Sequence, residues 1–230
     1  MTSHAHTPLT LASASPRRRR LLALLGLGYD ITAADTPETL DPAFADDPGA
    51  LAMRLAAAKA HVARNEGARG LILAFDTIVV NSGELLGKPE DEAGGRAMLR
   101  SLSGRTHDVV TGVAMLAPAS RDAHTFAVAT AVRMRALSAA EIDTWLASDE
   151  FLGCAGAYNI ESCLAEVDAD QCFQNVAGLP LCHLYIALAQ PEYRALVGDA
   201  ECPVQRCDAI RHTRCALGPR LVAGAGGDRG

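Results

Sequence analysis

The sequence lacks both the long apolar runs of membrane proteins and the basic excess of proteins that coat nucleic acids. The 230-residue chain has no stretch of about 18 consecutive apolar residues, so we expect no transmembrane helix. Its formal net charge is -6, which argues against a surface that binds nucleic acid broadly. The N-terminal stretch MTSHAHTPLT has neither the basic nor the apolar segment of a signal peptide. We therefore expect a cytoplasmic protein with no membrane partner and no stable binding of nucleic acid.

Lysine is almost absent. Of the 21 basic residues only Lys59 and Lys88 are lysines, and the others are arginines. A chain that uses arginine wherever any cation serves retains lysine where a compact, flexible ammonium group is needed. Chance is the alternative explanation, and the residues that accompany the two lysines decide between them.

The apolar pattern predicts an α/β (mixed α+β) domain around a mixed sheet, because strands and helices alternate irregularly along the chain. The most apolar run, LILAFDTIVV at 71–80, is typical of a buried central strand. Two strands of a meander are expected over 106–116 and 125–135. Helices are expected to begin at Pro16 and to cover 48–64, 91–102, 138–145 and 179–188.

Apolar periodicity fades after Gln190, and the chain closes with a glycine-rich stretch. We therefore expect one domain over residues 1–190. Residues 191–230 are expected to form a C-terminal extension that is largely disordered.

One acidic residue, Asp76, interrupts the central apolar run. A carboxylate in a buried strand is costly unless it is paired or binds a metal, so Asp76 is a candidate general base or metal ligand. The alternative is a strand-end aspartate that bonds to a nearby turn. Lys88 follows twelve positions later, and a strand, a tight turn and a return strand would bring the two together. Lys59, late on its helix, would reach the same cleft.

The stretch SASPRRRR, residues 13–20, places four arginines behind a serine–proline pair. Arg17 and Arg18 fall in the first turn of the expected helix, where backbone N–H groups and the helix dipole favour anions. Ser13 adds a hydroxyl. With the two lysines, these groups predict a polyphosphate site in which carboxylates hold a divalent metal. The next two arginines, Arg19 and Arg20, are expected to be solvated or ion-paired.

Several motifs of the chain resemble, in order and spacing, those of the Maf family of nucleoside triphosphate pyrophosphatases, over about residues 9–190. They are LASASPRR (11–18), DTPET (35–39), LAAAKA (55–60), FDTIVV (75–80), GKPEDEA (87–93), LSGRTHDVVTGVAM (102–115), AGAY (155–158) and QNVAGLPL (174–181). The resemblance implies a Maf-like (ITPase-like) fold, an elongated mixed sheet flanked by helices in two lobes with a central cleft. It also implies hydrolysis of a nucleoside triphosphate to the monophosphate and pyrophosphate with Mg²⁺ or Mn²⁺.

The resemblance also implies roles for individual residues. Asp76 matches the aspartate assigned as proton acceptor, and Lys88 matches a site lysine that would stabilise the leaving pyrophosphate. The positions that match phosphate contacts are Ser13, Arg17, Arg18, Lys59 and Lys88. Glu38 and Asp76 match metal ligands, although a proline replaces one aspartate of the DTPET stretch. Both lysines fall on site positions of the family. Chance is therefore a much weaker explanation for why these two positions retain lysine.

Three positions bear on substrate choice. Arg17 and Thr77 resemble the branch that acts on dTTP and UTP, whereas Glu161 resembles the branch that acts on 7-methyl-GTP. An ionised Glu161 only accepts hydrogen bonds, which favours a base edge that offers N–H donors. Phe75, where the family usually has a small residue, would reshape the pocket or fill the core.

We expect dTTP, UTP or a modified pyrimidine nucleotide as the substrate. The alternatives are 7-methyl-GTP, inosine or xanthosine triphosphate, and a non-enzymatic module that regulates septation or binds nucleic acid. A homodimer is left open.

Overall fold

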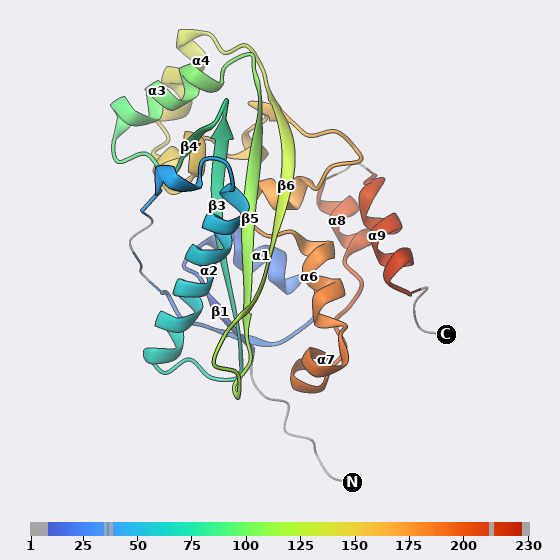
Figure 1. The fold of residues 1–230 in the computed structure, drawn as a ribbon. Helices are drawn as coiled ribbons and strands as arrows, with labels where there is room; N and C mark the ends of the chain where they lie inside the picture. Colours follow the sequence, from blue (N-terminus) through green and yellow to red (C-terminus); the bar gives the residue numbers. More distant parts are fainter. Residues whose placement is uncertain (1–8, 35, 37–38, 212–213, 227–230) are drawn as a thin grey trace.

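The computed structural model describes residues 9–34, 36, 39–211 and 214–226, which form a mixed α/β fold around one seven-stranded sheet (Figure 1). The strands are β1 Leu9–Ala12, β2 Tyr29–Ile31, β3 Leu71–Asn81, β4 Glu84–Leu86, β5 Thr106–Leu116, β6 His124–Met134 and β7 Ala165–Glu166. Their order is β2-β1-β3-β5-β6-β7, with β4 paired to β3 off this path. β1 runs parallel to β2 and β3, whereas the other pairs are antiparallel. The expected mixed sheet flanked by helices is confirmed.

Helices cover both faces of the sheet. They are α1 Pro16–Ala23, α2 Pro48–Asn65, α3 Glu92–Leu102, α4 Ala139–Leu146, α5 Phe173–Val176, α6 Leu181–Leu188, α7 Pro191–Val197, α8 Val204–Arg211 and α9 Leu217–Gly226. The long helix α2 crosses one face and packs on β3 and β5, while α1 and α6 lie behind the sheet (Figure 1). Within the described ranges, no helix has both the length and the apolar character needed to cross a membrane.

The central strand β3 divides its side chains between the two faces. Leu73 and Phe75 pack in the core cluster that contains the leucines of α1, whereas Ile72 and Ala74 pack with alanines of α2. Because successive side chains of a strand point to opposite faces, the next residue, Asp76, faces α2. Thr77 correspondingly faces α1. One strand therefore delivers a polar group to each face at the same level of the sheet.

One edge of β3 is left open beside these two residues. β1 pairs with β3 as far as Ala74, and β4 pairs with it from Val79 onward. Between these two positions the edge is flanked by the loop that follows β1 and leads into α1. This interruption lets residues from both faces of the sheet reach one cavity.

Helix α2 lies close to β5 at Gly112, the register partner of Asp76. A Cβ atom at Gly112 would collide with the backbone carbonyl group of Ala52 in α2. The absence of a side chain there sets the spacing between α2 and the sheet. This spacing in turn sets the distance that the Lys59 side chain must span to reach Asp76.

Replacing Gly112 by alanine is expected to lower the free energy of unfolding by about 1–3 kcal/mol, because the backbone of α2 must move away. Urea unfolding measures the change. Gly28→Ala is the control, since a Cβ there meets nothing within 4 Å, and it should change the stability by less than about 0.5 kcal/mol. Equal midpoints for the two variants would contradict the close packing of α2 on β5.

The residues after Gln190 differ from the expected disordered extension. In the described part of this extension there are three helices, α7 to α9, of which α9 packs against α6 (Figure 1). Tyr193 and Cys207 are buried and anchor this region to the core. These contacts depend on single apolar residues at irregular spacing, which leave no periodic signal in the sequence. The domain boundary at residue 190 stays a prediction.

Candidate active site

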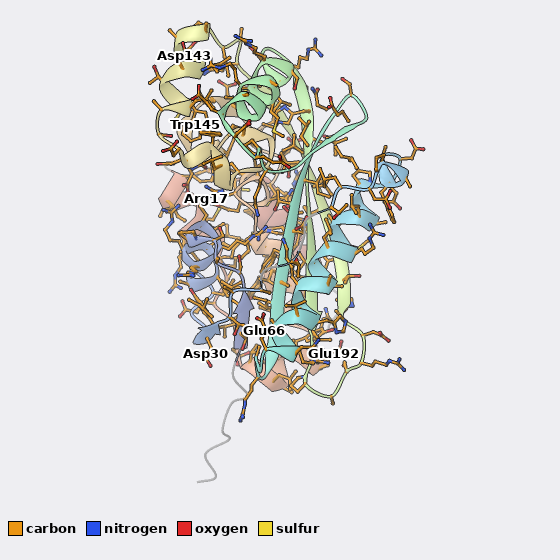
Figure 2. All side chains as sticks on the ribbon, turned by 90° about the vertical axis from the view of Figure 1, so that its left-hand side faces the viewer. Arg17, Asp30, Glu66, Asp143, Trp145 and Glu192 are labelled. Atoms are coloured by element: carbon orange, nitrogen blue, oxygen red, sulfur yellow. The ribbon has the colours of Figure 1, made fainter. Side chains whose placement is uncertain are left out.

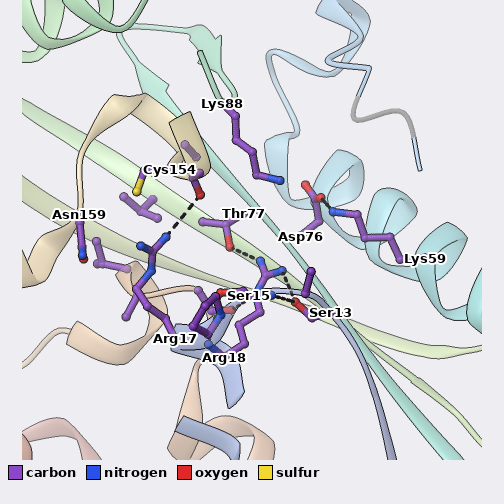
Figure 3. Close-up of a pocket in the computed structure, with 18 of the residues that line it drawn as sticks. Ser13, Ser15, Arg17, Arg18, Lys59, Asp76, Thr77, Lys88, Cys154 and Asn159 are labelled. Atoms are coloured by element: carbon purple, nitrogen blue, oxygen red, sulfur yellow. Dashed lines mark hydrogen bonds and ion pairs between the residues drawn. The ribbon is translucent and has the colours of Figure 1, made fainter. Parts of the chain in front are cut away.

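A cavity of about 570 Å³ opens beside the free edge of β3 and the start of α1 (Figure 3). Its volume lies in the range of small-molecule sites, roughly 300–1,000 Å³. The lining includes seven of the residues predicted from the sequence, namely Ser13, Arg17, Arg18, Lys59, Asp76, Thr77 and Lys88. In Figure 2, Arg17 lies between the part of the molecule that carries Asp143 and Trp145 and the part that carries Asp30 and Glu66. The predicted residues from four separate segments are thus brought together.

Helix α1 presents its arginines to the cavity through the expected cap. Ser15 is the N-cap residue, and its Oγ accepts a hydrogen bond from the backbone N–H of Arg18 at 3.4 Å. Pro16 occupies the first helical position, where its missing N–H costs nothing. Arg17 donates from Nη2 to the carbonyl oxygen of Gly153 at 3.4 Å. The start of α1 therefore supplies both charged side chains and backbone N–H groups to the cavity.

Arg18 is held by three groups from different segments. Its Nε donates to the carbonyl oxygen of Gly178 at 2.9 Å, and its Nη2 donates to Thr77 Oγ1 at 3.0 Å. Its Nη1 lies 3.4 Å from Ser13 Oγ, which accepts the bond. A planar guanidinium with several fixed partners is preorganised, so less side-chain entropy is lost when it binds an anion.

Asp76 lies across the cavity and forms an ion pair with Lys59 (Figure 3). The Nζ of Lys59 donates to Asp76 Oδ1, and the two side chains are only 7% and 4% exposed. A buried carboxylate persists where a cation compensates the lost hydration. Both residues were predicted to lie at one cleft, and the structure pairs them directly.

Lys88 reaches the cavity by the predicted return strand. β3 and β4 form an antiparallel hairpin in which Val79 faces Leu86. The turn uses Ser82 and Gly83, which have φ angles of 52° and 85°, the left-handed values that a tight hairpin of two residues requires. The hairpin brings Lys88 to the same wall as Asp76.

A buried polar network behind Arg18 was not predicted from the sequence. Thr77 Oγ1 lies 3.0 Å from Thr111 Oγ1, which donates to the backbone oxygen of Asn175 at 3.0 Å. Asn175 is fully buried, and its Nδ2 donates to the carbonyl oxygens of Val109 and Val128. The network fixes the segment that ends in Gly178 against the sheet. The only sequence signal was the position of these three residues inside three of the family-like motifs.

Tyr158 and His107 form a second buried pair, at another wall of the cavity. Tyr158 lines the cavity, and its hydroxyl lies 2.8 Å from His107 Nε2, with the two rings packed edge to face. Burial lowers the pKa of His107 to about 4 and raises the pKa of Tyr158 far above its usual value. Both groups are therefore neutral near pH 7.

The stability of the protein is expected to fall as the pH drops from about 6.5 toward 4. The pKa of His107 is about 4 in the folded state and near 6.5 in the unfolded chain, so the unfolded state binds more protons in this window. Stability rises with pH across the window and levels off above it. The contribution of His107 lost at pH 5 is about 2 kcal/mol.

Urea unfolding of the wild type and of His107→Gln at pH 7 and pH 5 tests this expectation. The stability advantage of the wild type should shrink by about 2 kcal/mol at the lower pH, because the other titrating groups are common to both proteins. A difference between the two proteins that does not depend on pH would contradict a neutral, buried His107.

Glu161 and Phe75, both connected above with substrate choice, do not line this cavity. Glu161 accepts two hydrogen bonds from the exposed Arg20, at 3.0 and 2.8 Å. Phe75 is fully buried in the core, with the Arg18 guanidinium 5.8 Å from its ring centroid. Asn159, which was not predicted from the sequence, lies on the lining instead. Glu161 therefore does not contact the cavity, although its predicted role in specificity would require such a contact.

The donor set for a divalent metal consists of one described carboxylate, that of Asp76. Glu38, the other predicted ligand, lies outside the described residues. Within the described part of the chain, no three His, Cys, Asp or Glu side chains are grouped to hold a metal ion. Mg²⁺ at phosphate sites is usually held by one or two carboxylates together with substrate phosphates and water. Asp76 therefore fits a metal that is shared with a bound triphosphate.

Known proteins match this chain over the region that contains the cavity. A family model described as Maf-like protein matches residues 8–191. A dTTP/UTP pyrophosphatase of Myxococcus xanthus is 46% identical over 179 residues, which cover 76% of this chain and 88% of the relative. Proteins with the same name from Geobacter sulfurreducens and Syntrophomonas wolfei are 42% and 40% identical and are covered over 92% and 95% of their lengths. The two alignments cover 76% and 78% of this chain.

Proposed function

The chain belongs to the Maf-like protein family, and we propose that it hydrolyses dTTP and UTP to the nucleoside monophosphate and pyrophosphate. The observation that carries the proposal is the convergence of Asp76 with Lys59, Lys88, Arg17 and Arg18 on one cavity. Four cationic side chains and a helix N-terminus at one cavity match the charge of a triphosphate. The dTTP/UTP pyrophosphatases identified as relatives support the choice of nucleotide.

We propose Mg²⁺ or Mn²⁺ as the cofactor, held by Asp76 and the phosphate oxygens of the substrate, with Glu38 as a further ligand. When bound, the cation neutralises charge on the phosphates. The chain supplies the remaining positive charge through its arginines and lysines.

The residues of the cavity have separate roles in the proposed reaction. Asp76 orients a water molecule toward the α-phosphorus and accepts its proton, while Lys59 fixes the orientation of the carboxylate. Arg18 and Lys88 bind the oxygens of the departing pyrophosphate, where negative charge develops. Arg17 adds a positive charge at the N-terminus of α1. Arg17, Arg18, Lys59 and Asp76 each have a hydrogen-bond or ion-pair partner before the substrate arrives, which lowers the cost of ordering them.

A panel of nucleoside triphosphates, assayed for pyrophosphate release with Mg²⁺, with Mn²⁺ and with EDTA, tests the proposal. We expect dTTP and UTP to give the highest kcat/KM and EDTA to abolish release. Preference for 7-methyl-GTP, or for inosine or xanthosine triphosphate, would overturn the choice of base but keep the chemistry.

The same panel separates the enzyme from a nucleic-acid-binding module. Absence of release from every nucleotide, with salt-sensitive binding of an oligonucleotide that Asp76→Asn leaves unchanged, would support the module instead. Light scattering of the same preparation determines whether the chain forms a homodimer.

A further inference from the structure

The chain continues past the region that the family model matches, and part of this continuation contacts the C-terminal end of α1, the helix that carries the arginines of the cavity. We call residues 201–211, which include α8, the C-terminal brace. We propose that the C-terminal brace is a positioning element for Arg18, which it holds through α1 and through the segment 172–178. This inference rests on the proposed function, because it treats Arg18 as a group that binds the triphosphate.

The first set of contacts fixes the C-terminal end of α1. The backbone N–H of Glu201 donates to the carbonyl oxygen of Leu25 at 2.8 Å, and Arg206 Nη1 donates to that of Leu24 at 3.0 Å. The last carbonyls of a helix have no partners within it and carry the negative end of its dipole, so a guanidinium stabilises them. Because α1 has only eight residues and a helix this short is marginal alone, fixing one end restrains the other, which carries Arg18.

The second set of contacts fixes the segment 172–178. Gln174 is buried, and its Nε2 donates to Cys207 Sγ of the brace at 3.4 Å. The guanidinium of Arg211 lies 4.4 Å from the ring centroid of Phe173, within the range of a cation–π interaction. The brace therefore holds this segment through Phe173 and Gln174, which do not line the cavity.

The two sets of contacts converge on Arg18. Arg18 belongs to α1, and its Nε donates to Gly178 at the end of the braced segment. Gly178 has a φ of 97°, and a Cβ there would lie 3.2 Å from Arg18 Nε, so the close approach needs a glycine. No residue of the brace is among the described residues that line the cavity, so any effect on catalysis must act through other residues.

The test compares two double variants of the full chain in steady-state hydrolysis of dTTP. Arg206→Gln/Arg211→Gln removes the side-chain contacts of the brace to α1 and Phe173. Arg194→Gln/Arg220→Gln changes the net charge equally at exposed arginines of α7 and α9, which contact Asp199 and the carbonyl oxygen of Ala216 elsewhere in the extension. We expect the brace variant to lose about tenfold in kcat/KM, mainly through KM, and the control to stay within about twofold of the wild type.

A double-mutant cycle separates positioning from a general structural role. If the brace acts through Arg18, its variant should cost less than about twofold in an Arg18→Ala background. The conservative variant Arg206→Lys should restore most of the loss due to Arg206→Gln, because lysine also donates to the carbonyl of Leu24. If circular dichroism shows that the double variant is unfolded, Arg206→Gln alone supplies the same comparison.

The outcomes decide the two proposals separately. A wild type that releases no pyrophosphate from any nucleotide overturns the proposed function and this inference with it. An active wild type whose brace variant matches the control, or loses as much activity without Arg18 as with it, overturns the inference alone.

Discussion

Replacement of Asp76 by asparagine is expected to lower kcat for pyrophosphate release by about 10²- to 10⁴-fold, the range typical of a lost general base. Asparagine has nearly the same shape, but its side chain cannot accept a proton from water. Its amide oxygen also lacks the negative charge with which the carboxylate attracts a divalent metal. Steady-state kinetics with dTTP at saturating Mg²⁺ measures the loss. KM should change much less than kcat, because Lys88 and the arginines still bind the phosphates.

The unfolding free energy of the same variant must be measured, because Asp76 is buried against Lys59. Breaking a buried ion pair from one side typically costs about 3–5 kcal/mol, so rates are compared at a temperature where both proteins are folded. Glu166→Gln, which removes an exposed carboxylate paired with Arg133, is the control and should keep full activity. Full activity of a folded Asp76→Asn in the presence of metal would exclude Asp76 as the proton acceptor.

The parts of the site that follow from local rules were predictable from the sequence. A lone carboxylate in the apolar run at 71–80 indicated that Asp76 needs a partner, and the structure supplies Lys59. The serine–proline pair at 15–16 predicted the start of α1, since both residues satisfy the first turn of a helix. The spacing between Asp76 and Lys88 predicted the hairpin of β3 and β4. Each of these signals lies within a short stretch of chain.

The parts that depend on distant contacts were not predictable in this way. Asn175 donates to strands that lie 66 and 47 positions away, and a buried asparagine has no local pattern that reveals its partners. Arg20 and Glu161 are 141 positions apart, so no sequence rule connects the substrate argument about Glu161 with an arginine of α1. The helices after residue 190 fall in the same class, because isolated side chains such as Cys207 anchor them.

Replacement of Arg18 by alanine is expected to lower kcat/KM for dTTP by about 10- to 150-fold, which corresponds to the 1.5–3 kcal/mol typical of a hydrogen bond to a charged group. A rise in KM alone would indicate that Arg18 binds the phosphates equally in the ground state and the transition state. A fall in kcat as well would indicate that its contact strengthens as pyrophosphate leaves. Arg18→Lys should recover only part of the loss, because an ammonium cannot reproduce the planar contacts to Gly178 and Thr77.

Arg20→Ala tests whether phosphate binding depends on an arginine held in a defined position or only on the positive charge of α1. Arg20 lies two positions further along α1, and its guanidinium is paired with Glu161 outside the cavity lining. Its loss should change kcat/KM by less than about twofold, since an exposed ion pair contributes roughly 0–1 kcal/mol. Equal losses in the two variants, both weakened by added salt, would mean that the four arginines act through a diffuse positive field. A large loss confined to Arg18 would instead assign phosphate binding to the one arginine that Ser13, Thr77 and Gly178 hold in place.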